Sequence, residues 1–120
     1  MSTSSRLRMV LDTGDARSIY CHSDGYPSHQ LTILTEHYNT VERVRELMEL
    51  GDLSYLQPKI KPEPGEEHSF MKPHKDSEGR IDTTIAYHRD RGEPLRNGRW
   101  DGVDRQNYNY LFNGTEWRIE

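Results

Sequence analysis

Residues 19–29 of the chain read Ile19-Tyr20-Cys21-His22-Ser23-Asp24-Gly25-Tyr26-Pro27-Ser28-His29. Their first four positions alternate as in a half-buried strand, so that Ile19 and Cys21 face one side and His22 the other. An Asp-Gly pair and a Tyr-Pro pair then give two turn signals in succession, so the chain is expected to leave the sheet here. The stretch therefore predicts a connection from a strand to the element that follows it.

The preceding residues predict that this strand belongs to a β-hairpin. Residues 6–12 begin with alternating polarity and end with apolar side chains, and residues 13–15 read Thr-Gly-Asp. Two apolar-rich runs on either side of a short turn that contains glycine are typical of a hairpin.

Two consecutive helices are expected after the stretch. Ser28 can cap the first helix, because apolar residues follow it at helical spacing. The second helix is expected at residues 40–50, with Asn39 as its N-cap, an apolar stripe along one face, and Gly51 at its C-terminal end.

Residues 57–79 are predicted to form a long loop that is rich in prolines and charges. Four prolines interrupt this segment, and each lacks the backbone N–H that a helix or a central strand needs. Loops of this length are usually functional or disordered. The hydrophobic fraction of the whole chain is only 32%, which predicts a small core together with a long unstructured segment.

Regular structure is expected to return after this loop. Residues 82–88 are β-branched and fit a strand, which runs into a charged turn at residues 89–94. A glycine-rich connector then contains Trp100 and Val103. An Asn-Gly turn at residues 113–114 lies between aromatic-rich runs and predicts a C-terminal hairpin.

Together these elements predict the fold class. Two hairpins, one further strand and two consecutive helices indicate a single α+β domain over residues 1–120. Its sheet is expected to be antiparallel, with about five strands and with both helices on one face. A doubly wound α/β fold is disfavoured, because strands and helices do not alternate along the chain.

Charge and cysteine content narrow the classes of partner. The 16 basic and 20 acidic residues give a net charge of −4, which is unlike a basic nucleic-acid-binding protein. The single cysteine, Cys21, excludes an intramolecular disulfide and a multi-thiolate zinc site. No apolar run approaches the ~18 residues that cross a bilayer. We therefore expect a protein of a reducing cytoplasm that makes no membrane contact.

Two short segments carry the candidate binding residues. The first collects imidazole and carboxylate groups, which are ligands for zinc, manganese or iron; alternatively, its aspartate only stabilises its own turn. The second carries guanidinium groups that can bind a phosphate or a carboxylate; alternatively, they form an internal charge network that fixes the turn. The candidates are His22, Asp24, Tyr26 and His29 in the first segment and Tyr87, His88, Arg89 and Arg91 in the second.

No catalytic residue is assigned and no cofactor is expected. The chain has no phosphate-binding glycine loop, no nucleophile elbow and no zinc-protease motif. Whether a metal binds is left open by the sequence.

Three groups of residues are distinctive as a set: residues 19–27, residues 36–40 with 50–54, and residues 86–93 with 108–112. They resemble a family of small proteins that are encoded by tailed bacteriophages and prophages. The resemblance covers most of the chain apart from residues 57–80. It implies expression in the cytoplasm of a bacterial host and a role in host takeover or in counter-defence, and it supplies no catalytic residues.

The leading expectation is a non-enzymatic accessory protein that binds and inhibits a host protein, a component of bacterial immunity, as anti-CRISPR proteins do. The alternative is a nucleotide- or metal-binding protein, either a signal sponge or a phosphodiester-cleaving enzyme, that uses the His22/Asp24 loop and the Arg89/Arg91 turn. This alternative requires the two segments to be adjacent in space. Single-stranded nucleic acid is a less favoured partner, because stacking on the C-terminal aromatic residues would also need a basic rim.

Overall fold

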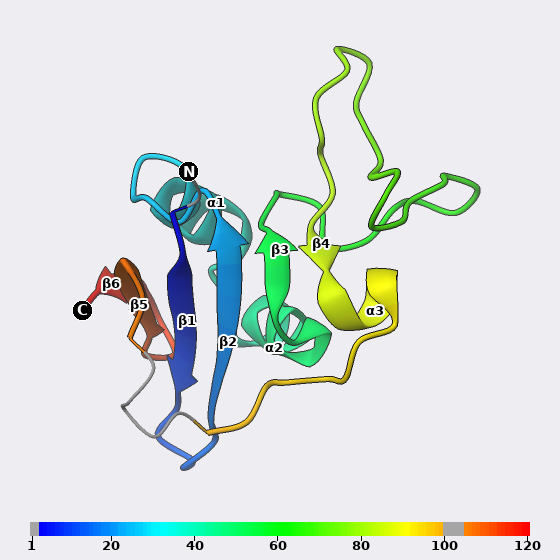
Figure 1. The fold of residues 1–120 in the computed structure, drawn as a ribbon. Helices are drawn as coiled ribbons and strands as arrows, with labels where there is room; N and C mark the ends of the chain where they lie inside the picture. The colour runs from blue at the N-terminus through cyan, green and yellow to red at the C-terminus, as the bar shows by residue number, and fades with distance from the viewer. Residues whose placement is uncertain (1–2, 100–104) are drawn as a thin grey trace.

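The computed structural model describes residues 3–99 and 105–120, which form a compact unit of mixed α and β structure. The elements are β1 (Ser5–Val10), β2 (Ala16–Ser23), α1 (Gln30–His37), α2 (Val41–Leu50), β3 (Leu53–Tyr55), β4 (Ile85–Ala86), α3 (Tyr87–Arg91), β5 (Tyr108–Phe112) and β6 (Trp117–Ile119). The strands form one sheet in the order β4-β3-β2-β1-β5-β6 (Figure 1). Trp100 and Val103 of the glycine-rich connector lie outside the described residues.

The first hairpin is confirmed. β1 and β2 are antiparallel, with Leu7 opposite Ile19, and a turn that includes Gly14 at φ 90° joins them. Leu7, Ile19 and Cys21 are fully buried, because the alternating pattern places them all on the same side of the sheet.

The sheet itself is mixed and has six strands, which corrects the prediction of an antiparallel sheet of about five. β3 runs parallel to β2, and β5 runs parallel to β1. The additional strand is β3 at Leu53–Tyr55, a segment for which no strand was predicted. Hydrophobic alternation does not report strand direction, whereas a connection through two helices carries the chain back to the starting edge and allows parallel pairing.

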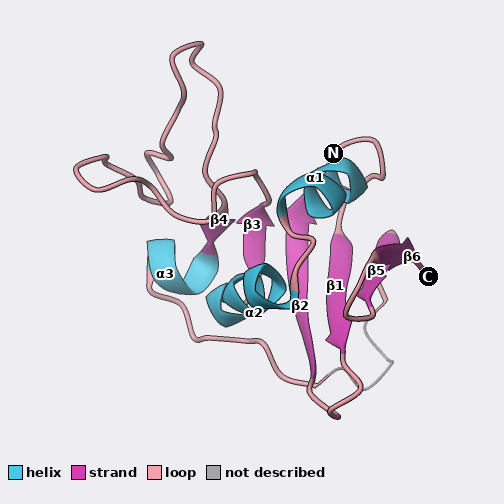
Figure 2. Ribbon diagram, turned by 180° about the vertical axis from the view of Figure 1, so that it is seen from behind, coloured by secondary structure: helices cyan, strands magenta, loops and turns pink. Residues whose placement is uncertain are grey.

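Both predicted helices are present and cover the same face of the sheet (Figure 2). α1 begins at Gln30, and its N-cap is His29, without a side-chain cap bond, so Ser28 is not the cap. α2 is capped by Thr40, whose hydroxyl accepts the backbone N–H of Arg43, in place of the predicted Asn39. Gly51 ends α2 at φ 76°, as expected.

One predicted strand in the second half of the chain takes a different form. The strand expected at residues 82–88 is reduced to β4, and residues Tyr87–Arg91 form the short helix α3. The carboxylate of Asp90, the fourth residue of this helix, accepts the backbone N–H of the N-cap residue Ala86 and so holds the first turn. The C-terminal hairpin of β5 and β6 is confirmed, with Gly114 at φ 106° in its turn.

Among the residues that the structure describes, no helix has the length and apolar character needed to span a membrane. The core lies between the sheet and α1 and α2, and the C-terminal hairpin reaches it from the far edge. The indole N–H of Trp117 donates to the Tyr38 carbonyl oxygen at 2.7 Å, which ties β6 to the end of α1.

Candidate functional site

The segment between β3 and β4 projects from one edge of the sheet as two successive loops (Figure 1). We call residues 57–84 the arm. Backbone hydrogen bonds close its base. The Lys59 N–H donates to the Asp82 carbonyl oxygen at 3.2 Å, and the Thr84 N–H donates to the Lys59 carbonyl oxygen at 2.8 Å. A further bond from the Asp82 N–H to the His74 carbonyl oxygen holds the second loop together. The proline-rich segment therefore has a defined shape, in contrast to the unstructured segment that composition predicts.

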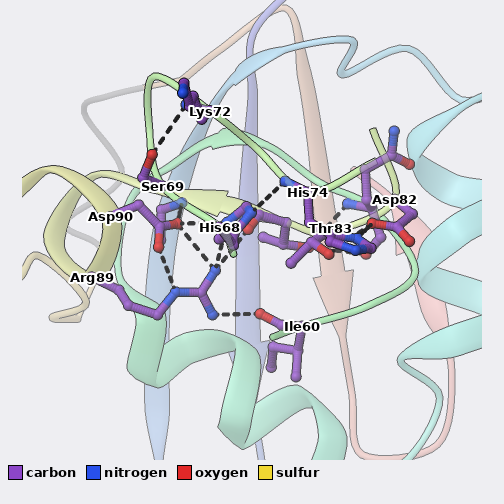
Figure 3. Close-up of polar contacts among 12 residues, drawn as sticks. Ile60, His68, Ser69, Lys72, His74, Asp82, Thr83, Arg89 and Asp90 are labelled. Carbon is purple, nitrogen blue, oxygen red and sulfur yellow. Dashed lines mark hydrogen bonds and ion pairs between the residues drawn. The ribbon is translucent and has the colours of Figure 1, made fainter. Parts of the chain in front are cut away.

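Arg89 anchors the arm to α3. Its guanidinium donates to the carbonyl oxygens of Ile60, near the start of the arm, and of Thr84, at its end. The same group pairs with the Asp90 carboxylate at 2.9 Å. Figure 3 shows this guanidinium between Asp90 and Ile60. One side chain thus joins the two ends of the arm, which are far apart in the sequence.

His68, in the first loop of the arm, lies against the same Arg89–Asp90 pair (Figure 3). Its side chain and that of Asp90 are only 1% and 5% exposed, with His68 Nε2 lying 3.3 Å from an Asp90 oxygen. His68 Nδ1 accepts the backbone N–H of His74 at 2.9 Å, so the ring hydrogen is on Nε2 and points toward the carboxylate.

Asp90 is ionised within this buried cluster. Burial by itself would raise the pKa of its carboxyl, but the hydrogen bonds from the Arg89 guanidinium and the Ala86 N–H outweigh burial and hold the pKa below its usual value. The cluster is therefore a hydrogen-bonded charge pair in which the carboxylate is buried and the guanidinium is partly exposed, and its several bonds fix its geometry.

A second cluster holds the arm nearer to solvent. His74 lies 2.7 Å from an Asp82 oxygen and 3.1 Å from a Glu66 oxygen. The Lys59 ammonium lies 2.9 Å from Glu66 and 3.7 Å from Asp82. The lysine therefore takes the place between the two carboxylates that a cation would occupy. Within residues 3–99 and 105–120, no group of three or more His, Cys, Asp or Glu side chains could hold a metal ion.

The first predicted segment gathers around Tyr55, a residue that the sequence did not single out. His29 stacks on the Tyr55 ring, with centroids 5.4 Å apart and planes 9° apart, and Tyr26 lies against His29. The carboxylate of Asp24, a residue in the left-handed region at φ 54°, is hydrogen-bonded to Tyr55. Burial, together with this carboxylate, raises the pKa of Tyr55 to about 12. Because β2 and β3 are parallel, their carboxyl-terminal ends, and these residues with them, lie at the same end of the sheet.

His22 is separate from this group. It is exposed on β2, and its Nδ1 lies 2.7 Å from the Tyr20 hydroxyl. Cys21 faces the helices, and its sulfur accepts a hydrogen bond from the Gln30 side-chain amide of α1. The alternation of the strand therefore places His22 on the opposite face of the sheet.

The second predicted segment makes contacts within the protein. Tyr87 packs on Phe70 of the arm, and the Arg91 guanidinium lies 4.8 Å from the centre of the Phe70 ring. His88 Nδ1 lies 2.7 Å from the Glu93 carbonyl oxygen. Together with the contacts of Arg89, these interactions agree with the internal charge network that was the alternative interpretation of this segment.

The two predicted segments do not form one site. Arg89 lines a recess of about 360 Å³ beside Leu50 of α2, on the side of the sheet that carries the helices, whereas His22 lies on the other face. The sequence placed both on strand ends, but the chain enters α3 directly after β4, so strand alternation does not extend to residue 89.

The residues that sequence reasoning missed are the anchoring groups of the arm. They are Lys59, Glu66, His68, His74 and Asp82. They have no common spacing and lie in a segment without periodicity, so only their chemistry, histidines among acids, could have marked them.

No protein-family model, no curated protein and no solved structure matches the chain. The geometry of the arm and of its anchoring clusters therefore carries the functional conclusion.

Proposed function

We propose that the chain is an accessory protein of a bacteriophage that binds and inhibits a protein of its bacterial host, with the arm as the main contact surface. The observation that supports this proposal is the arm itself, a projecting segment of 28 residues, numbered 57–84, whose ends are fixed by Arg89 and whose loops are fixed by His68 and His74. A stability role alone does not require so long a projection.

Preorganisation is the physical reason why such an arm suits binding. A disordered loop of this length would lose much conformational entropy on docking, whereas a loop that is already held by buried hydrogen bonds loses less. The buried Arg89–Asp90–His68 cluster thus stabilises the shape of the surface in the absence of a partner.

The resemblance to phage and prophage proteins supports the host setting. It implies expression in the bacterial cytoplasm and favours a component of bacterial immunity as the partner. The nucleotide- or metal-binding alternative needed His22 and Arg89 in one site, and it is weakened because these residues lie on different faces of the sheet.

Affinity capture with the purified full chain tests the proposal. Bacterial lysate passed over the immobilised protein at modest salt should yield one protein in stoichiometric amount, and that protein, once purified, should lose activity when the chain is added. Beads that carry an unrelated acidic protein of similar size serve as the control. Capture of no protein, together with a rise in melting temperature on adding a nucleotide or a divalent metal, would overturn the proposal in favour of ligand binding.

A further inference from the structure

A closed turn in the arm holds two apolar side chains in opposite environments. The Ser69 N–H donates to the Lys72 carbonyl oxygen at 3.1 Å, and the Lys72 N–H donates back to the Ser69 hydroxyl at 3.1 Å. Phe70 and Met71 are the two central residues of this turn. Figure 3 shows Ser69 and Lys72 joined by this contact.

Phe70 attaches the turn to the body of the protein, and Met71 does not. Phe70 packs on the Tyr87 ring and under the Arg91 guanidinium, and its N–H donates to the Asp90 carbonyl oxygen. Met71 is 86% exposed, compared with 51% for Ile119, the next most exposed of the large apolar residues in the described part of the chain. The fold therefore fixes the turn and leaves its methionine in solvent.

Two lysines and two glutamates line the recess beside Met71. Residues 68–75 contain two lysines and no acidic residue, and both Lys72 and Lys75 line this recess of about 440 Å³. Neither lysine forms an ion pair within residues 3–99 and 105–120. Of the two acidic residues in the recess, Glu66 is held by Lys59 and His74, so only Glu67 opposes the lysines.

We propose that Met71 inserts into an apolar recess of the partner protein and that Lys72 and Lys75 pair with carboxylates on the rim of that recess. This inference rests on the proposed function and names the chemistry of the partner surface. Methionine is unbranched and polarisable and adapts to irregular apolar pockets. Unpaired lysines around it attract an acidic surface and orient the approach.

A protein surface is favoured over a membrane as the occupant. Only one apolar side chain of the turn is free, because the Phe70 ring is already packed against the body. One methionine and two lysines give a bilayer too little apolar contact for stable attachment. A single protruding side chain with a charged surround matches a pocket of a folded protein, where a few central residues supply most of the binding energy.

The test measures the affinity of the captured partner for three variants of the full chain. Met71→Ala and the double variant Lys72→Glu/Lys75→Glu should each weaken binding at least tenfold. Lys61→Glu is the matched control, because Lys61 is an exposed lysine of the arm that lines a different recess, and it should stay within twofold of the wild type. The altered side chains of all three variants are exposed, so melting temperatures should be unchanged.

Crosslinking then locates the contact. A photoreactive benzoylphenylalanine at position 71 should form an adduct with the partner at an apolar site flanked by aspartate or glutamate, whereas the same group at position 119, on the opposite edge of the sheet, should form none.

Three results would overturn the inference while leaving the proposed function in place. They are variants at 71, 72 and 75 that bind within twofold of the wild type, an equal loss in the Lys61→Glu control, and an adduct at a basic or neutral surface. Binding of the wild type to phosphatidylserine vesicles, lost in the same variants, would assign the turn to membranes. Failure of the wild type to form any protein complex would remove the proposed function and this inference together.

Discussion

Arg89 shows how one side chain can organise a long segment. Its guanidinium offers donors in a fixed plane, and these reach Ile60 and Thr84 at the two ends of the arm while the Asp90 carboxylate balances the charge. The sequence singled out Arg89 as a ligand-binding residue, and its observed contacts all lie within the protein. The same chemistry that binds a phosphate or a carboxylate here binds backbone carbonyl groups.

We expect Arg89→Met to loosen the arm while the rest of the fold remains intact. The substitution leaves two carbonyl groups and the Asp90 carboxylate without their donor, which should lower the free energy of unfolding by about 2 kcal/mol. Urea denaturation measures this loss. Hydrogen exchange should show faster exchange in residues 57–84 and unchanged protection in β1 and β2.

Arg80→Met is the matched control for this prediction. Arg80 lies on the arm, its side chain is 79% exposed and it pairs with the exposed Glu78, so its loss should change the free energy of unfolding by less than about 0.5 kcal/mol. Equal effects of the two substitutions, or unchanged exchange in the arm of the Arg89 variant, would contradict the anchoring role.

At the scale of elements, the pair of helices decides how the strands connect. α1 and α2 carry the chain from the end of β2 back to the start of β3, so that β3 joins the sheet in parallel. α2 is the better defined of the two in sequence, with an apolar stripe that includes Val44, Leu47 and Met48, all buried. Its start, however, is set by a local hydrogen bond that two neighbouring residues could supply.

Thr40→Ala should destabilise the protein, and Asn39→Ala should not. The Thr40 hydroxyl accepts the Arg43 N–H at 3.2 Å, and loss of such a cap costs about 1 kcal/mol. Chemical denaturation of both variants gives the comparison. A larger loss for Asn39→Ala than for Thr40→Ala would show that the cap in solution is the residue favoured by the sequence.

At the scale of the whole molecule, the C-terminal hairpin holds the N-terminal half together. The Tyr110 hydroxyl donates to the Gly25 carbonyl oxygen at 2.6 Å, and the Trp117 indole donates to Tyr38 at 2.7 Å. The first of these bonds fixes the turn that follows β2, and the second fixes the junction between α1 and α2. Both join residues more than 75 positions apart.

Tyr110→Phe should lower the free energy of unfolding by about 1–2 kcal/mol, because it removes one hydroxyl and leaves the buried Gly25 carbonyl without its donor. Tyr108→Phe is the control on the same face of β5, where the tyrosine stacks on Tyr110 without a hydroxyl contact among the described residues, and it should change stability by less than about 0.5 kcal/mol. Urea denaturation distinguishes the two, and an equal effect would show that the bond to Gly25 contributes nothing.

The sequence alone determined the local elements of this protein. Alternation fixed the first hairpin and the buried side of β2, the Asn-Gly turn fixed the last hairpin, and helical spacing fixed α2, because each pattern lies within neighbouring residues. The turn after Cys21 was also correct, and it does connect a strand to a helix.

The direction of β3 and β5, the shape of the arm and the roles of the charged residues depend on contacts between distant segments. Strand direction depends on which distant segments pair in the sheet, and hydrophobic periodicity within one segment does not indicate its partner or its direction. The arm is held by His68, Asp82 and Arg89, which come from separate segments and act through side-chain contacts. Because the chain enters α3 directly after β4, Arg89 contacts the arm and lies apart from His22. The candidate site that the sequence assembled from two strand ends is therefore replaced by an anchored arm.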